Sequence, residues 1–380
     1  MDVEHEAIYV FGAQQRLGEA QRHRIVRAQD LFHVPDVPRP NRSVESVARP
    51  RPERHVTTPI TRLQELLEAK MNAVNALIAT RMASENAPRI PEVTAHLIGA
   101  GGKRVRPLLT LAAAGLYDYR GDHDEKLAAT VEFIHTATLL HDDVVDESQQ
   151  RRGRPTANLL WDNQSSVLVG DYLFARSFQL MVEADSLRVM AILANAAAVI
   201  AEGEVLQLSV ARNLDTPEAT YIKVVRGKTA ALFAAATEVG ALVAGAPEEQ
   251  IDALRTYGDA LGIAFQIADD LLDLIGTDIG KNNGDDLREG KLTLPVIRAI
   301  ARADAGERIF WERLIGKGRY EDGDLDTALT IFARHGILDT VRDTAFDHAG
   351  RAQAALDIVP AGPIRQAMHD LAEFVVSRLR

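Results

Sequence analysis

The chain has 380 residues, of which 46% are hydrophobic and only 5% aromatic, and it contains no cysteine. The lack of cysteine excludes disulfides, thiolate nucleophiles and Cys-ligated metals, and it is compatible with the cytoplasm, where we expect the protein. A formal net charge of −11 excludes a global basic field for nucleic acid, so any anion site must be built locally.

Residues 1–56 differ in composition from the rest of the chain. They hold five of the 15 prolines, nine arginines, eight acids and no lysine. The near balance of acids and arginines argues against a transit peptide, and the acidic start "MDVEHEAIYVFG" is unlike a signal peptide. We predict a flexible Pro/Arg-rich N-terminal extension; an over-extended start site explains the composition equally well.

Apolar residues recur at helical spacing from "TTPITRLQELLEAKMNAVNALI" onward. Thr58 can cap the first helix and Pro59 suits its first position. Similar periodicity continues along the chain, broken by Gly or Pro, and no convincing period-two strand appears. No run reaches the roughly 18 uninterrupted apolar residues typical of a membrane span. We therefore predict an all-α fold, one large helical bundle over residues 57–380 with no transmembrane segment.

Three aspartates lie within five positions of the stretch "LLHDDVVDE", namely Asp142, Asp143 and Asp146. On a helix Asp142 and Asp146 share a face, and like charges at that spacing cost a few tenths of a kcal/mol. The apolar segment before them indicates a buried helix, so the carboxylates need a counter-charge, for which a hard divalent cation is suited. One such cluster alone fits a solvated acidic face equally well.

A second copy of the pattern follows in "AFQIADDLLDLIG", with Asp269, Asp270 and Asp273. Two such helices facing each other across a central cleft would place carboxylate oxygens opposite one another. Mg²⁺ prefers a few carboxylates together with phosphate oxygens. The pair therefore predicts several Mg²⁺ ions shared with the phosphates of a substrate.

Basic residues gather beside glycines at four places in this acidic chain. They are Lys103, Arg104 and Arg106 in "GGKRVRP", Arg151 and Arg152 in "RRGRP", Lys228 with Thr229 in "RGKTA", and Lys281 and Lys291 in "GKNNGDDLREGK". Each cluster alone fits a solvated surface, but together with the paired aspartates they indicate a diphosphate clamp. The "GKT" fragment lacks the upstream glycine of a P-loop.

These segments, with "IHTATLLHDDVVDESQQRRG", "GDYLFARSF", "GEVLQL" and "FQIADDLLD", resemble the trans-isoprenyl diphosphate synthases over roughly residues 60–380. The closest resemblance is to the long-chain group, the octaprenyl, solanesyl and decaprenyl diphosphate synthases that make quinone side chains. It implies a homodimeric prenyltransferase that condenses isopentenyl diphosphate head-to-tail onto an allylic diphosphate such as farnesyl diphosphate. Transient membrane contact would serve release of a lipophilic product.

The resemblance also implies roles for individual residues. The principal Mg²⁺ ligands would be Asp142, Asp146 and Asp269, with Asp143, Asp270 and Asp273 completing the motifs. The isopentenyl diphosphate site would be formed by Lys103, Arg106, His135 and Arg152, and the allylic diphosphate site by Arg151, Lys228, Thr229, Gln266, Lys281 and Lys291. Ionisation of the allylic diphosphate would be assisted by Mg²⁺ and by Lys228, and the resulting carbocation would be attacked by the double bond of isopentenyl diphosphate.

Two small residues, Ala137 and Thr138, lie about one turn before Asp142. An aromatic side chain there would close the hole into which a product tail grows, so we expect a long product. A class I terpene cyclase is the nearest rival enzyme, but the second Asp-rich motif and "GGKRVRP" count against it. A non-catalytic subunit of a heteromeric synthase is the other alternative, although such subunits tend to lose the aspartates or arginines that this chain keeps.

Overall fold

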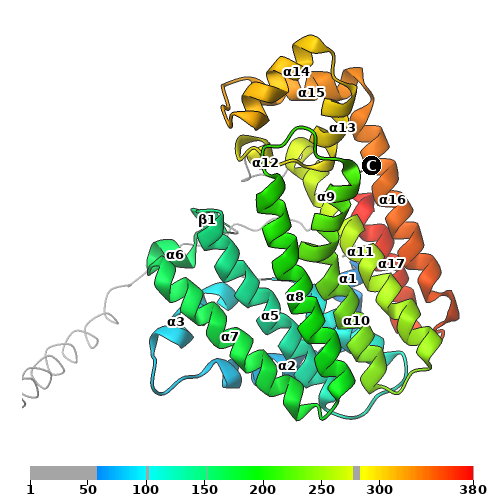
Figure 1. The fold of residues 1–380 in the computed structure, drawn as a ribbon. Helices are drawn as coiled ribbons and strands as arrows, with labels where there is room; N and C mark the ends of the chain where they lie inside the picture. Colours follow the sequence, from blue (N-terminus) through cyan, green and yellow to red (C-terminus); the bar gives the residue numbers. More distant parts are fainter. Residues whose placement is uncertain (1–57, 100–101, 152, 277–282, 380) are drawn as a thin grey trace, which may run out of the picture. The chain divides into compact units, whose positions relative to one another are not determined.

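The computed structural model describes residues 58–99, 102–151, 153–276 and 283–379 (Figure 1). The predicted extension, residues 1–56, lies outside the described residues and stays a prediction. Across the described ranges nearly every regular element is a helix, so the all-α prediction is confirmed.

Within the described ranges the elements follow one another as a series of helices with a single short hairpin. They are α1 (Pro59–Leu66), α2 (Glu68–Met82), α3 (Arg89–Gly99), α4 (Val105–Gly115), α5 (His123–Val145), β1 (Gln150–Arg151), β2 (Arg154–Pro155), α6 (Ala157–Leu160), α7 (Asn163–Glu183), α8 (Leu187–Val210), α9 (Glu218–Val225), η1 (Arg226–Ala230), α10 (Ala231–Val243), α11 (Glu248–Ile275), α12 (Asp285–Arg288), α13 (Leu294–Arg302), α14 (Ala305–Trp311), η2 (Glu312–Gly316), α15 (Asp324–Arg334), α16 (Ile337–Ala355), η3 (Leu356–Ile358) and α17 (Pro363–Ser377).

The described chain begins with the predicted cap. The Thr58 hydroxyl oxygen accepts a hydrogen bond from the backbone N–H of Thr61, and Pro59 opens α1. The apolar face predicted for one helix is divided at Leu67, which ends α1 and precedes α2. The Leu67 side chain is nevertheless buried in the core, together with the other residues of that apolar face: Ile60, Leu63, Met71, Val74 and Ile78.

The strands β1 and β2 form an antiparallel pair, with Arg151 opposite Arg154. Gly153 lies between them with φ +72°, a conformation that costs an L side chain and favours glycine. No strand was expected from the sequence. Alternation cannot be recognised over two residues, so this hairpin was not predictable from periodicity.

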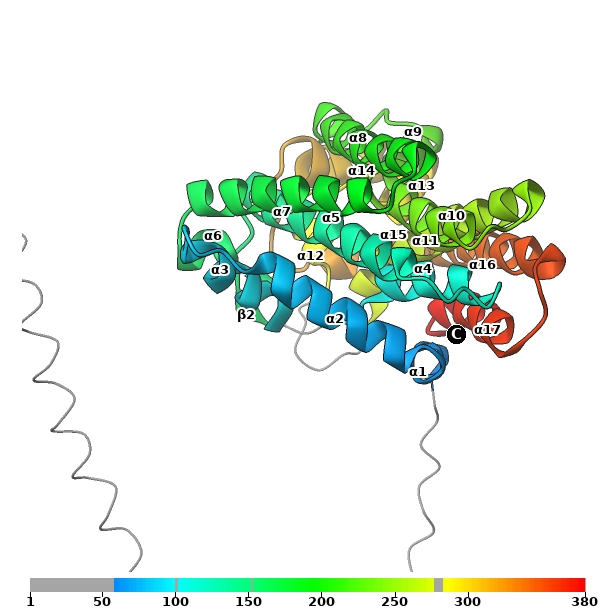
Figure 2. The ribbon, with the colours of Figure 1, turned by 90° about the horizontal axis from the view of Figure 1, so that it is seen from below.

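Helices α5 and α11 occupy the middle of the bundle. Helix α5 packs against α2, α4, α7 and α10, and Figure 2 shows it between α2 and α7. Helix α11 packs against α10, α16 and α17. Because α10 contacts both central helices, it holds together the two elements that carry the Asp-rich motifs. The core between them is mostly Ala, Leu, Ile and Val.

Helix α8 was not expected from the sequence to resemble a membrane span. By length and composition alone it is long and apolar enough to cross a membrane, and only 28% of its most apolar window is buried. The prediction required an uninterrupted apolar run, which Arg188 near the start and Glu202 and Glu204 near the end prevent. A single helix of this kind is weak evidence for membrane insertion. It does leave apolar surface exposed, including Leu187, Val205 and Leu208.

Candidate active site

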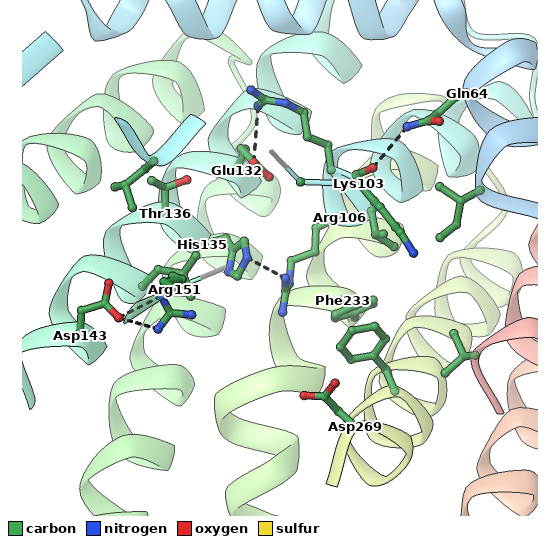
Figure 3. Close-up of a pocket in the computed structure, with 18 of the residues that line it drawn as sticks. Gln64, Lys103, Arg106, Glu132, His135, Thr136, Asp143, Arg151, Phe233 and Asp269 are labelled. Atoms are coloured by element: carbon green, nitrogen blue, oxygen red, sulfur yellow. Dashed lines mark hydrogen bonds and ion pairs between the residues drawn. The ribbon is translucent and has the colours of Figure 1, made fainter. Parts of the chain in front are cut away.

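A cavity of about 780 Å³ lies where α4, α5, α10, α11 and α17 meet. Six of the predicted site residues line it together: Lys103, Arg106, His135, Asp143, Arg151 and Asp269. Figure 3 shows them arriving from different elements of the fold and turning toward a common space. Residues far apart in sequence therefore combine cationic and anionic side chains in one cavity.

Arg106 and His135 form the centre of the basic wall (Figure 3). Arg106 Nη1 lies 3.0 Å from His135 Nε2. Since arginine carries only donors, the imidazole nitrogen accepts, which places the ring proton of neutral His135 on Nδ1. The Arg106 guanidinium carbon also lies 4.5 Å from the centroid of the Phe233 ring. These two contacts orient the guanidinium in the cavity, while Lys103 stays exposed beside it.

Asp142 lies next to a lysine and a glutamate from other elements. Lys228 Nζ is 2.8 Å from Glu204 Oε2 and 3.9 Å from Asp142 Oδ2. Burial raises the pKa of Asp142 to about 6, and the nearby Glu204 and Asp146 carboxylates act in the same direction while Lys228 opposes them. Asp146 follows the end of α5 and is exposed. Glu204 and Asp142 thus share one cation.

Asp143 is completely buried and directed at Arg151. Its Oδ1 accepts from Arg151 Nε at 2.9 Å and from Nη2 at 2.8 Å. Its Oδ2 is also buried, with no hydrogen-bond partner within the described part of the chain. In this conformation Asp143 holds the Arg151 side chain at the cavity wall.

In the second Asp-rich motif the two adjacent aspartates also differ in burial. Asp269 is exposed and lines the cavity, whereas Asp270 is buried. Both Asp270 oxygens accept hydrogen bonds, from Tyr221 Oη at 2.6 Å and from Gln266 Nε2 at 2.9 Å. Burial, aided by the Asp286 carboxylate, raises the pKa of Asp270 to about 7. Asp269 therefore faces the cavity and Asp270 the interior.

Asp273 contacts the start of the short helix α12. Its two carboxylate oxygens accept from the backbone N–H groups of Asp285 and Asp286, each at 3.2 Å. Burial and the Asp286 charge raise the pKa of Asp273 to about 6. Lys291 Nζ pairs with Asp286 at 3.0 Å and with Glu289 at 2.6 Å, so its charge is directed at these acids.

Lys228 and Thr229 lie on a π-helical turn. The run from α9 through η1 to α10 is continuous, and η1 widens one turn of it. Such turns occur frequently at functional sites. At this turn Gly227 approaches α8 so closely that an added Cβ would lie 3.0 Å from both Gly203 Cα and the Val199 carbonyl oxygen. Close backbone packing therefore fixes the turn that carries both side chains.

Four predicted residues remain. Arg152 and Lys281 lie outside the described residues. Ala137 is fully buried in the core, and the Thr138 hydroxyl donates to the His135 carbonyl at 2.8 Å. The cavity is lined by Thr136 and Leu139, which flank this pair, and not by Ala137 or Thr138.

Several cavity residues were missed by the sequence analysis. The cavity is also lined by Gln64 of α1, His96 of α3, Glu132 of α5, Phe374 and Val375 of α17, and Arg378 just after α17. None of them stands in a motif with a recognisable charge pattern, so only the tertiary fold identifies them. Glu204 does not line the cavity, but it lies in "GEVLQL", one of the segments that carry the resemblance.

Comparison with known proteins gives a consistent result. The family model described as polyprenyl synthetase matches residues 87–332. Octaprenyl diphosphate synthase of Escherichia coli (strain K12) is 42% identical over 325 residues, covering 84% of this chain and 99% of that protein.

Two solved structures are also similar. A decaprenyl diphosphate synthase from Rhodobacter capsulatus is 65% identical with a TM-score of 0.83, over 85% of this chain and all of that one. A polyprenyl synthase from Caulobacter crescentus CB15, complexed with calcium and isoprenyl diphosphate, is 52% identical with a TM-score of 0.81, over 85% and 99% of the two chains. The chain therefore belongs to the polyprenyl synthetase family and is a prenyltransferase.

Proposed function

We propose that the protein is a long-chain trans-polyprenyl diphosphate synthase. It would add isopentenyl diphosphate units sequentially, head-to-tail, to an allylic primer such as farnesyl diphosphate. The observation that carries the proposal is the cavity in which Lys103, Arg106, His135 and Arg151 meet aspartates of both Asp-rich motifs. A cavity with these charges suits two diphosphate groups and the cations that accompany them.

Mg²⁺ fits the donor set on three grounds. The carboxylates are hard oxygen ligands, Asp142 has a raised pKa beside two other acids, and Asp146 and Asp269 are exposed. Among the described residues no group of three His, Cys, Asp or Glu side chains is placed to hold an ion alone. Because Mg²⁺ prefers few carboxylates plus phosphate oxygens, the diphosphate of a substrate would complete its coordination. Calcium in the Caulobacter crescentus structure shows that a relative binds a divalent cation.

The predicted site residues have separate tasks in this proposal. Asp142, Asp146 and Asp269 would hold Mg²⁺, which when bound neutralises charge on the allylic diphosphate as that group departs. Lys228 and Arg151 would contact the same diphosphate, with Arg151 already fixed by Asp143. Lys103, Arg106 and His135 would bind isopentenyl diphosphate and hold its double bond within reach of the allylic carbon.

The product would be an octaprenyl to decaprenyl diphosphate for a quinone side chain, as in ubiquinone. Support comes from relatives named for octaprenyl and decaprenyl products and from the small Ala137 and Thr138 near the first motif. The roles that the resemblance gives to Arg152, Lys281 and Lys291 remain part of the proposal. A cytoplasmic location is also part of it.

A homodimer would cover the exposed apolar face of α7 and α8. On α7 this face includes Leu168, Phe178 and Val182, and on α8 it includes Val205 and Leu208. Exposed apolar side chains gathered on two helices suit an association site. Transient membrane contact during product release would use exposed apolar surface as well.

The test is a product assay. Purified full-length protein would be incubated with Mg²⁺, farnesyl diphosphate and labelled isopentenyl diphosphate, and the dephosphorylated products separated by chain length. We expect a ladder ending in one long prenyl alcohol. Absence of elongation without a partner protein would favour a subunit of a heteromeric synthase. Cyclic hydrocarbons from the primer alone would favour a class I terpene cyclase.

A further inference from the structure

A buried tyrosine outside the motifs is joined to the proposed allylic site by a chain of hydrogen bonds. Tyr221 of α9 donates to Asp270 Oδ2 at 2.6 Å. Gln266 Nε2 donates to Asp270 Oδ1 at 2.9 Å, and Thr229 Oγ1 donates to Gln266 Oε1 at 2.9 Å. Four side chains from α9, η1 and α11 are thereby connected.

Each bond of this network has a defined donor and acceptor in the structure. The Gln266 amide presents its nitrogen to Asp270 Oδ1, which accepts. The amide oxygen then faces Thr229 and takes the hydroxyl proton. Tyr221 donates to the other carboxylate oxygen, which removes the freedom of Asp270 to rotate. The orientation of Thr229 therefore depends on a tyrosine that lies two hydrogen-bonding residues away.

Burial makes the arrangement sensitive to loss of one donor. Tyr221 and Thr229 are each 6% exposed and Asp270 is 4% exposed, so solvent does not readily replace a missing partner. Without the phenol, one Asp270 oxygen would be left buried and unsatisfied, and the carboxylate would turn to find another partner. Gln266 and then Thr229 would lose their fixed orientations.

We propose that Tyr221 is a positioning residue, which acts through Asp270 and Gln266 to orient Thr229 for use of the allylic diphosphate. The inference rests on the proposed function, since it is the resemblance that gives Thr229 and Gln266 a place in the allylic site. The four connected residues come from α9, η1 and α11, whereas Arg106 lies on α4, Lys103 just before it, and His135 on α5. The contribution of these last three residues to isopentenyl diphosphate binding should not depend on Tyr221.

The test compares Tyr221→Phe with Tyr257→Phe. Tyr257 is also fully buried, but its hydroxyl donates to the backbone carbonyl of Met368 at 2.8 Å, in the core. Both variants lose one buried hydrogen bond and keep the ring. We expect both variants to unfold at a lower temperature than the wild type. Only Tyr221→Phe should also lower kcat, on the order of 10- to 100-fold, the range found when a residue that orients a ligand through a hydrogen bond is replaced. The KM for isopentenyl diphosphate should stay unchanged.

A double-mutant cycle identifies the route of the effect. In a Thr229→Val background, Tyr221→Phe should lower kcat little further, because the group it orients is gone. Asp270→Asn provides a milder variant. It keeps an acceptor for Tyr221 but presents N–H to Gln266, so it should also lower kcat.

Each outcome is decisive once the wild-type enzyme elongates. Equal kcat in Tyr221→Phe and Tyr257→Phe, a multiplicative effect with Thr229→Val, or wild-type kcat in Asp270→Asn would each overturn the inference. An inactive wild type would instead reject the proposed function itself.

Discussion

Lys228 and Glu204 form an ion pair of 2.8 Å within reach of the first Asp-rich motif, while the distance from Lys228 to Asp142 is 3.9 Å. Lys228 is therefore paired more closely with Glu204 than with Asp142, although both carboxylates lie within ion-pair distance. The pair explains how a lysine and several carboxylates lie close together before any substrate arrives. It also identifies Glu204, which the sequence analysis assigned no role, as a residue that controls the position of Lys228.

Replacing Glu204 with Gln should impair catalysis without unfolding the protein. Lys228 would then pair with Asp142 and occupy a carboxylate that is proposed to bind Mg²⁺. We expect kcat to fall on the order of 10- to 100-fold. Glu202→Gln is the control, because Glu202 lies two residues away on α8 and is exposed. Steady-state kinetics that gave similar values for both variants would contradict this role.

Removing Arg151 from its pair with Asp143 should destabilise the protein more than removing the charge of Asp143. Arg151→Ala would leave a fully buried carboxylate without its counter-charge, which costs roughly 3 kcal/mol or more. Asp143→Asn should cost less, since Arg151 is partly exposed and can regain water. Arg188→Ala, which breaks an exposed pair with Glu248, should cost less than about 1 kcal/mol. Urea unfolding of the three variants tests this order, and equal losses would contradict it.

Ala137→Tyr should shorten the product. Ala137 is completely buried on α5 before the first motif, and the larger side chain would enter the space proposed for the growing tail. Overpacking there costs typically 1–3 kcal/mol, so total activity should fall as well. The distribution of chain lengths is the informative measurement, because lost stability lowers the yield without changing the length. An unchanged distribution would reject the proposed location of the tail.

Stability without metal should depend on pH between about 4 and 7. Asp142, Asp270 and Asp273 have pKa values raised to about 6, 7 and 6, so the folded protein binds more protons than the unfolded chain in this window. The contribution of these groups to stability is therefore largest at low pH and is lost as pH rises. Mg²⁺ binding should oppose the loss, because it favours the ionised carboxylates.

Thermal unfolding from pH 4 to 7.5, with and without Mg²⁺, measures this effect. Asp270→Asn should remove the part of the slope that Asp270 causes. A pH profile identical to that of the wild type would show that Asp270 does not titrate in this window.

Val205→Lys should weaken self-association. Val205 is 66% exposed on the apolar face of α8, and a buried lysine there would oppose dimer formation. Ile309→Lys is the matched control, since Ile309 is 69% exposed on α14. Sedimentation should show a dimer for the wild type and for Ile309→Lys, and a shift toward monomer for Val205→Lys. A monomeric wild type, or no difference between the variants, would contradict the proposed interface.

The sequence predicted those features that depend on local chemistry. Thr58 and Pro59 begin the first helix because capping and a fixed φ act within one turn. The two Asp-rich motifs were recognisable because acids interrupt otherwise apolar helices. The family resemblance depends on several segments taken together. It predicted that residues from separate motifs belong to one site, and six of these residues line one cavity.

The tertiary contacts were not predictable in the same way. The pairing of Asp143 with Arg151 depends on how the β1–β2 hairpin folds back on α5, and the pairing of Lys228 with Glu204 depends on how α8 crosses η1. Arg378 lines the cavity only because α17 packs beside α11. The π-helical turn has no periodic signature, since one widened turn leaves the pattern on either side unchanged.

The contact between Gly203 and Gly227 has a practical consequence for engineering. Their backbones approach so closely that a Cβ on Gly203 would lie 2.8 Å from the backbone nitrogen of Lys228. In chimeras built from relatives that make chains of different length, α8 and η1 should be exchanged as one unit. A crossover between them would combine a helix shaped for one partner with a turn shaped for another, and Lys228 would be displaced even though every motif residue was retained.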